Sequence, residues 1–294
     1  MADFMQQVVA GLASGSIYAA LALALVLIHR ATGVINFAQG EMATFSTYIA
    51  WTLTTNHGWA YWPAFALTLG VSFFGGAAVH QTIIRPNEKG SLLRVVIVTI
   101  GLLIMINGLV TWIWGGEVRA VQSPFPAGTT QIGGVAITTA DIGTIVVVLA
   151  TVVALWALFQ YTKLGLAMRA AAVNPAEARL VGVRVTWMLS LGWGLAAVLG
   201  AVAGMLAAPS VFLDPNLMAA LLIYAFAAAV LGGIDSPVGA VVGGLTLGVG
   251  LNLIGTYVDF VGADLRLPVA LLVILVVLLV KPTGIFGKAE VRRV

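Results

Sequence analysis

The chain has 294 residues, of which 61% are hydrophobic and only 9% are charged. A soluble domain averages about 25% charged residues, so this sequence cannot cover a globular surface with polar groups. The composition excludes a soluble globular protein and predicts one that lies in lipid. The sequence contains no cysteine, which excludes disulfides and thiolate metal sites.

Apolar segments long enough to cross about 30 Å of hydrocarbon recur along the chain. We expect helical spans at residues 7–28, 36–54, 60–83, 95–114, 138–160, 187–208, 219–233, 237–257 and 266–281. Backbone groups in lipid must pair within their own segment, which favours helices. The prediction is an all-α polytopic membrane bundle of about eight to nine transmembrane helices, in a single domain over 1–294. Segment 36–54 is polar enough to be partly re-entrant, and the first span lacks the basic flank of a cleaved signal.

The basic residues predict the orientation. Nine spans place the termini on opposite sides, and a cytoplasmic C-terminus puts twelve of the fourteen Lys and Arg residues inside. Arg119 and Arg266 are the two that fall outside. This agreement with the positive-inside rule predicts a cytoplasmic segment at about 161–186 and an outside loop at about 115–137. The N-terminus is expected outside.

Small residues recur at four-residue spacing within the spans, which lets helix backbones approach closely. The pairs are Gly11/Gly15, Gly200/Gly204, Gly239/Gly243 and Gly244/Gly248. We expect these glycines to serve packing. The sequence shows no convincing internal repeat.

Motifs for enzymatic chemistry are missing from the sequence. It contains no GxxxxGK[ST] loop, no HExxH and no GxSxG, and its three histidines are scattered. We therefore predict no catalytic residue, no metal site and no cofactor in this chain. Transport driven by ATP would need an ATPase on another chain.

One polar stretch lies inside an expected span. In "GVINFAQGEMATF", Asn36 and Gln39 are three residues apart and are expected to form a capping box, with Glu41 in the first two turns of the helix. Intramembrane acids are functional candidates by default. A structural role for these three residues is favoured over direct contact with a solute. Thr44, Asn107 and Asn252 are expected to hydrogen-bond between helices, which is favoured over lining a pathway.

The stretch "RAAAVNPAEARLVGVRV", residues 169–185, stands out as a short, water-facing helix. Asn174 suits the N-cap, Pro175 the first helical position, and Gly182 the stop, while Glu177 is expected to complete a capping box. Seven or eight residues, about 11 Å, are too few for stability in water alone. Its apolar face is expected at Ala176, Leu180 and Val183. It is either a connector on the lipid headgroups or a docking element for a cytoplasmic protein.

Four stretches together carry a family resemblance. "GLAMRAAAVNPAEARLVGV" resembles the cytoplasmic coupling segment of bacterial ABC-transporter permeases of the branched-chain amino acid (LivH-like) type. "GLASGSIYAALALALVLIHRATGVINFAQGEMATFSTYIA", "AVLGGIDSPVGAVVGGLTLGV" and "VKPTGIFGK" resemble the opening, late hairpin and close of the same family. Many relatives have His where Gln39 stands, so any role of that His does not carry over.

The resemblance implies one permease subunit of a four-part importer in the bacterial inner membrane. Its partners would be a second homologous permease or a second copy of itself, two cytoplasmic ATPases that bind ATP and Mg, an extracytoplasmic solute-binding protein and membrane lipid, with no nucleic acid. The helix around 174–182 would be the coupling helix seated in a cleft of the ATPase. The implied coupling residues are Arg169, Asn174, Pro175, Glu177, Ala178, Arg179 and Gly182.

Other functions stay open at this point. Permeases of this type are also expected in importers for urea, amides or carboxylates, because specificity lies largely in the binding protein. A secondary carrier or channel would keep several ionisable residues inside the membrane, whereas only Glu41 fits that description here. A scaffold that transports nothing would use the short helix for docking alone.

Overall fold

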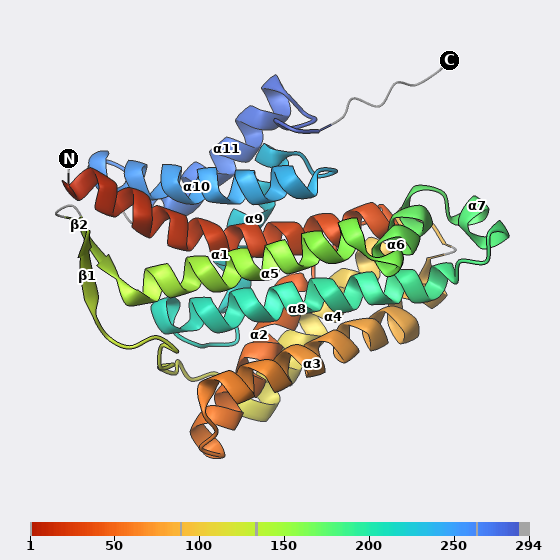
Figure 1. Ribbon diagram of the computed structural model, residues 1–294, viewed down its shortest axis with the longest axis horizontal. Helices are drawn as coiled ribbons and strands as arrows, with labels where there is room; N and C mark the ends of the chain where they lie inside the picture. Colours follow the sequence, from red (N-terminus) through yellow and green to blue (C-terminus); the bar gives the residue numbers. More distant parts are fainter. Residues whose placement is uncertain (1, 89, 133–134, 263, 288–294) are drawn as a thin grey trace. The chain divides into compact units, whose positions relative to one another are not determined.

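The computed structural model describes residues 2–88, 90–132, 135–262 and 264–287, and most of them are helical (Figure 1). The helices are α1 (Ala2–Thr32), α2 (Gln39–Trp51), α3 (Tyr61–Val79), α4 (Leu92–Trp114), α5 (Thr139–Tyr161), α6 (Lys163–Val173), α7 (Pro175–Leu180), α8 (Val185–Val211), α9 (Met218–Gly232), α10 (Pro237–Tyr257) and α11 (Arg266–Val280). Two π-helical turns, Thr52–Asn56 and His80–Ile84, extend α2 and α3, and a 3-10 turn follows at Arg85–Asn87.

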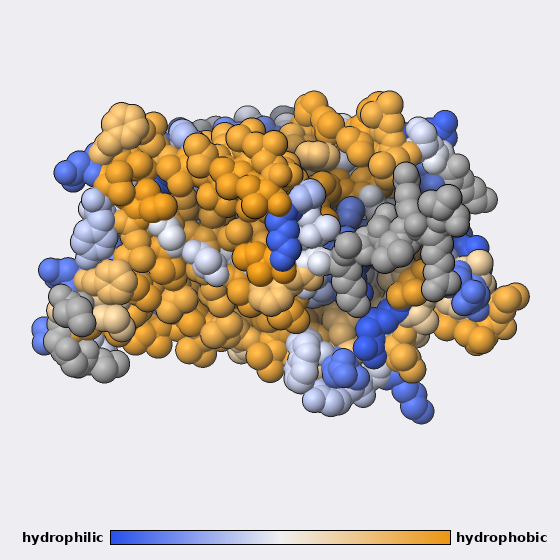
Figure 2. All heavy atoms as spheres, turned by 90° about the horizontal axis from the view of Figure 1, so that it is seen from above, coloured by the Kyte–Doolittle hydropathy of each residue, from blue (hydrophilic) through white to orange (hydrophobic). Residues whose placement is uncertain are grey.

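Six helical segments of the described chain are long and apolar enough to cross a membrane: Ala2–Thr32, Tyr61–Asn87, Leu92–Trp114, Thr139–Tyr161, Val185–Val211 and Pro237–Tyr257. The apolar helices α9 and α11 are shorter, with 15 residues each. The all-α polytopic bundle is confirmed, and a count of eight to nine spans stays a prediction. Hydrophobic residues cover most of the face in Figure 2, as lipid contact requires.

The chain divides into two compact units, each assembled from separate segments. The first comprises residues 1–26, 125–146 and 220–294, and the second comprises 27–124 and 147–219. The expected single membrane domain over 1–294, with its loop boundaries, stays a prediction.

Close helix packing defines the first unit. α1 crosses α10 where Gly11 and Gly15 meet Gly244 and Gly248, and a methyl group added at Gly248 would collide with the backbone of Gly15. Nδ2 of Asn252 donates to the backbone oxygen of Gln7 at 2.7 Å, which joins the same two helices. Both observations confirm the predicted packing roles of these residues.

The first unit also holds an element that we did not predict. Residues 129–138 form an antiparallel hairpin in which β1 (Thr129–Ile132) pairs with β2 (Val135–Thr138). The hairpin overlaps the segment predicted as an outside loop, about 115–137, and its β-branched residues favour strands. The place of this segment outside the membrane stays a prediction.

In the second unit, α2 and α3 pack against α8, whose residues are mostly buried. Gly200 and Gly204 of α8 lie against α2, and a methyl group on either would meet the side chain of Gln39 or Thr47. Gly76 of α3 makes the same kind of approach to Trp193 and Ala197. Glycine at these positions brings the helix backbones together, as the four-residue spacing of Gly200 and Gly204 predicts.

Candidate functional site

The short helix predicted within 169–185 is present as α7, which has six residues and lies at one end of the second unit (Figure 1). Oδ1 of Asn174 accepts the backbone N–H groups of Ala176 and Glu177, both at 3.2 Å, and Pro175 occupies the first turn. The predicted N-cap is therefore confirmed.

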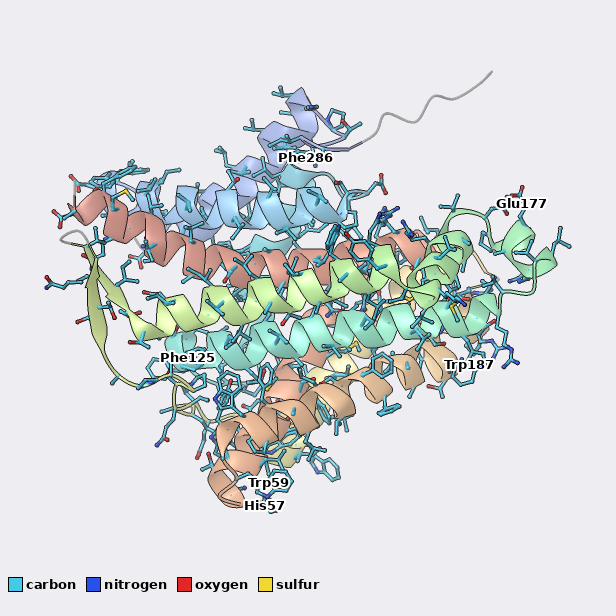
Figure 3. All side chains as sticks on the ribbon, in the orientation of Figure 1. His57, Trp59, Phe125, Glu177, Trp187 and Phe286 are labelled. Atoms are coloured by element: carbon cyan, nitrogen blue, oxygen red, sulfur yellow. The ribbon has the colours of Figure 1, made fainter. Side chains whose placement is uncertain are left out.

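The other half of the expected capping box is wrong. The backbone N–H of Asn174 donates to the oxygen of Ala170 at 3.1 Å, so it is not free for the carboxylate of Glu177. The reason is a second helix, α6, which runs up to Val173 and was not predicted. Glu177 projects instead from α7 into the surroundings (Figure 3).

Gly182 ends α7 with the hydrogen bonds of a Schellman motif. Its φ is +85°, its N–H donates to the oxygen of Arg179 at 3.1 Å, and the N–H of Val183 donates to the oxygen of Ala178 at 3.0 Å. A residue with a side chain is strained at this φ, which explains glycine here. Both ends of α7 are thus specified by the local sequence.

The faces of α7 differ from the prediction. Ala178 is the buried residue, and it packs with Ala171 of α6 and Val185 of α8. Leu180 and Val181 are 87% and 78% exposed. Ala176 is exposed too, whereas Val183 is partly buried and packs against the same cluster, so the residues of the expected apolar face do not share one environment. Two large aliphatic side chains remain free for a partner surface.

Arg169 lies apart from the other predicted coupling residues. It belongs to α6, and its Nη1 donates to Oε1 of Gln160 at 3.4 Å. Arg179 lies on α7 and faces a cavity that it shares with Arg85 and Arg184. The segment around 161–186 therefore consists of two helices with different surroundings.

The polar stretch before α2 is buried, but it does not cap the helix as expected. The helix begins at Gln39, and Oδ1 of Asn36 accepts the N–H of Ala38 at 3.1 Å in a turn before it. Nε2 of Gln39 donates to the oxygen of Ala196 on α8 at 2.9 Å. The prediction failed because the N-cap is Ala38, two residues after Asn36. The side chain of Gln39 instead accepts a hydrogen bond from Nδ2 of Asn36 at 3.3 Å and donates to the neighbouring helix.

This contact places the start of α2 beside the middle of α8. Ala196 is eleven residues, or about 16 Å, from the first residue of α8 and fifteen from its last. The other end of α2 meets the end of α4, where Nε1 of Trp114 donates to Oγ1 of Thr52 at 2.8 Å. With its π-helical turn, the helix runs from Gln39 to Asn56 and is entered through non-helical residues, and a partly re-entrant course stays a prediction.

Glu41 lies in the first turn of α2 and is 7% exposed. Nδ2 of Asn107 on α4 donates to its Oε2 at 3.3 Å and to the backbone oxygen of Pro215 at 3.0 Å. Asn107 thus joins α2, α4 and the loop between α8 and α9, and its predicted role between helices is confirmed.

Two hydroxyl groups follow Glu41 along the same face of α2, because Thr44 and Tyr48 are three and seven residues further on. Both side chains are fully buried, and Thr44 Oγ1 and Tyr48 Oη have no hydrogen-bond partner among the described residues. The predicted hydrogen bond of Thr44 between helices was therefore wrong. The ring of Tyr48 lies 5.1 Å from that of Trp114. We call Glu41, Thr44 and Tyr48 the polar face of α2. Its two buried hydroxyls can still form hydrogen bonds with a ligand.

A third polar group was missed by sequence reasoning. His80 is fully buried, with Nδ1 2.7 Å from Oγ of Ser190 on α8 and Nε2 2.9 Å from Oε1 of Glu88. It ties the turn after α3 to the first part of α8. The spacing of 110 residues between His80 and Ser190 leaves no local signal in the sequence.

Known proteins resemble the chain over nearly its whole length. The family profile for the branched-chain amino acid transport system permease component matches residues 7–280. The high-affinity branched-chain amino acid transport system permease protein BraD of Pseudomonas aeruginosa is 33% identical, with 99% of this chain and 98% of BraD covered. The corresponding LivH of Escherichia coli is 30% identical with the same coverage, and a probable LivH of Methanocaldococcus jannaschii is 29% identical over 91% of this chain and 87% of that protein.

The fold has a solved counterpart. PsaBC from Streptococcus pneumoniae, in a complex with Fab, superposes with a TM-score of 0.51 and covers 93% of this chain and 91% of its own. At 16% identity the likeness concerns the fold alone. Sequence matches over full length and a bundle of membrane-crossing helices lead to one assignment: the chain belongs to the family of multi-pass permease components of branched-chain amino acid transport systems.

Proposed function

We propose that the chain is the permease subunit of an ATP-driven ABC importer and forms half of the pathway for branched-chain amino acids or a related small polar solute. The observation that carries the coupling to ATP is α7, with both ends specified by caps and with Leu180 and Val181 exposed. Burying each of these side chains on a partner would contribute roughly 1.5–3 kcal/mol. Two exposed aliphatic side chains on so short a helix suit docking to a partner protein.

The proposed assembly contains the partners that the family resemblance implies. Two ATPases bind ATP and Mg on the cytoplasmic side, a second homologous permease or a second copy of this chain completes the pathway, and an extracytoplasmic protein delivers the solute. Lipid surrounds the bundle. The basic residues support a cytoplasmic C-terminus and an outside N-terminus in the bacterial inner membrane. ATP closure of the ATPases would move α7 and switch the bundle by alternating access.

The coupling residues take different parts in this proposal. Asn174, Pro175 and Gly182 define the ends of α7, and Ala178 anchors it to α6 and α8. Glu177 and Arg179 are exposed charges for contact with the ATPase, while Arg169 supports α6.

We also place the solute pathway beside the polar face of α2. A polar solute needs hydrogen-bond partners on its way through lipid, and Thr44 and Tyr48 carry buried hydroxyls without one. Asn36, Gln39 and Glu41 then serve as positioning residues, because Asn36 holds the turn before α2 and the hydrogen bonds of Gln39 and Glu41 join α2 to α8 and α4.

The docking role of α7 is tested with Leu180→Asp/Val181→Asp. Both side chains are exposed, so the folded chain should keep its thermal stability and its place in the membrane. We expect co-purification of the ATPase to fall at least tenfold, because two charges would enter an apolar contact. A matched control is Val118→Asp, which changes a valine that is 65% exposed in the loop predicted on the other side. Unchanged ATPase binding by the double variant would overturn the proposed coupling helix.

The transport activity is tested in vesicles that hold the complete importer. We expect uptake of labelled leucine, isoleucine or valine that requires ATP inside and the binding protein outside. Uptake of urea, an amide or a carboxylate under the same conditions would assign the importer to that solute instead. Uptake by the permease without ATPase would contradict the ABC mechanism and favour a secondary carrier or channel.

A further inference from the structure

A cavity of about 460 Å³ opens where α7, the start of α8 and the turn after α3 come together in the second unit. Its lining includes three arginines, Arg85, Arg179 and Arg184, together with Trp187. None of the described lining residues is acidic. Three guanidinium groups at one cavity create a positive potential that an anion would relieve.

These arginines are largely without protein partners. Nη1 of Arg85 donates to Oε1 of Gln81 at 3.1 Å, a neutral acceptor. Arg179 and Arg184 have no hydrogen bond or ion pair from their side chains within the described parts of the chain. The nearby carboxylate of Glu88 is held by His80 instead. The positive charge of the cavity is therefore not neutralised by the described residues.

The walls of the cavity are held in place before any ligand arrives. Oγ of Ser190 lies 2.7 Å from Nδ1 of His80, next to Gln81, and also donates to the oxygen of Thr186 at 3.0 Å. The wall formed by α7 ends at Gly182 with two backbone hydrogen bonds. A preorganised site loses less conformational entropy on binding than a flexible one.

The cavity lies at the ends of two helices that are long and apolar enough to cross a membrane. Gln81 and Arg85 come near the end of the span Tyr61–Asn87, and Thr186 and Trp187 from the first turn of the span Val185–Val211. Trp187 is 58% exposed and lies at the start of α8 (Figure 3). Tryptophan is typical of the interface between lipid and water, where phosphate groups of lipids are found.

We propose that this arginine cavity binds the phosphate headgroup of an anionic phospholipid. Arginine matches phosphate oxygens with paired N–H donors, and basic pockets between membrane helices are typical sites for anionic headgroups. The acyl chains would follow the exposed apolar surface of α3 away from the cavity. This proposal goes beyond the proposed transport function and does not depend on the identity of the solute.

A carboxylate of a partner protein is the competing occupant. The location favours lipid, because Thr186 and Trp187 belong to a membrane span, whereas Leu180 and Val181, the exposed aliphatic residues of α7, do not line the cavity. A free phosphate ion offers the same chemistry without the acyl chains. The experiment distinguishes the three.

The test compares the wild type with Arg85→Gln/Arg184→Gln in nanodiscs of phosphatidylcholine that contain 0, 10 or 30% phosphatidylglycerol. Native mass spectrometry counts the phosphatidylglycerol molecules that stay bound after other lipid is removed. We expect one strongly bound molecule per chain in the wild type and affinity about 25-fold lower in the double variant, at roughly fivefold per charge. The control, Arg30→Gln/Lys163→Gln, removes two exposed basic residues that do not line the cavity and should keep the lipid.

Arg85→Lys/Arg184→Lys guards against a variant that fails to fold, because it keeps the charge but loses paired donors, and it should bind with intermediate affinity. Equal retention of phosphatidylglycerol by the wild type and the glutamine variant would overturn the proposal. So would loss of ATPase binding in the glutamine variant with lipid retention unchanged, since the occupant would then be a protein carboxylate. Displacement of the lipid by 10 mM inorganic phosphate would identify a free anion as the ligand.

Discussion

The hydroxyl groups of Thr44 and Tyr48 on α2 have no hydrogen-bond partner within the described chain. For these two residues, a structural role and a role in transport therefore predict different effects of mutation. A buried hydroxyl without a partner lowers stability, since it has lost its hydrogen bonds to water. Removing Tyr48 Oη or Thr44 Oγ1 should therefore cost the fold nothing. A solute that binds these hydroxyls would lose its hydrogen bonds to them, so uptake should fall.

We predict that Tyr48→Phe and Thr44→Val leave the thermal unfolding temperature unchanged or slightly higher and reduce ATP-dependent uptake roughly two- to tenfold. Thermal unfolding in detergent and uptake in vesicles are the two measurements. Normal uptake by both variants would exclude this face of α2 from the pathway. A fall in both stability and uptake would indicate a structural role instead.

The carboxylate of Glu41 receives one hydrogen bond, from Nδ2 of Asn107. An amide oxygen can accept the same bond, and the attraction between a first-turn anion and the helix dipole contributes only about 0.3–1 kcal/mol. We predict that Glu41→Gln keeps uptake within about threefold of the wild type, whereas Glu41→Leu, which removes the acceptor, lowers thermal stability. An inactive but stably folded Glu41→Gln protein would show that the negative charge itself acts on the solute.

At the scale of one element, α7 holds its shape through its two ends. Replacing Asn174 by Ala removes two hydrogen bonds from the helix start and costs about 1 kcal/mol of helix stability. Replacing Gly182 by Ala places a side chain at φ +85°, with a strain of about 1–2 kcal/mol. Both changes leave the membrane-crossing helices untouched.

We predict that Asn174→Ala and Gly182→Ala lower the rate of ATP-driven uptake several-fold while unfolding of the bundle stays within about 2 °C of the wild type. Asn174→Asp, which keeps a side-chain acceptor, should restore most of the rate. Wild-type uptake with Asn174→Ala and Gly182→Ala combined would show that coupling does not require an ordered α7.

Local signals explain why some elements could be predicted from the sequence and others could not. Asn174, Pro175 and Gly182 lie at the ends of α7 or next to them, so the sequence could predict the helix and both its ends. The contact of Gln39 with Ala196 spans 157 residues, so the start of α2 could not be located and the capping box was misplaced. The burial of Ala178 likewise depends on its contact with α8. The sequence therefore did not identify Ala178 as the residue that attaches α7.

For the whole molecule, the distribution of the basic residues along the sequence predicts how the chain is oriented in the membrane. The absence of cysteine from the sequence makes single-cysteine variants free of background labelling. Thr130 and Phe260 lie in segments predicted outside, and Val173 lies in the segment predicted inside. All three side chains are exposed.

We predict that Thr130→Cys and Phe260→Cys react with a membrane-impermeant maleimide in intact cells, after removal of any outer membrane barrier. Val173→Cys should react only once the inner membrane is opened. The reagent is read out as a mass shift on the purified chain. The opposite pattern would reverse the orientation and remove α7 from the reach of a cytoplasmic ATPase.

The polar sequence of α2 also affects how the chain is made. Residues 39–56, which form α2 and its π-helical turn and include Gln39 and Glu41, are too polar to partition into lipid on their own as they leave the ribosome. Their hydrogen-bond partner on α8 is translated 157 residues later. Residues 39–51 should therefore wait at the water side and enter the bilayer only when α8 offers its buried face. A nascent chain stalled before Val185 should be cleaved by protease within α2, and one stalled after Val211 should resist.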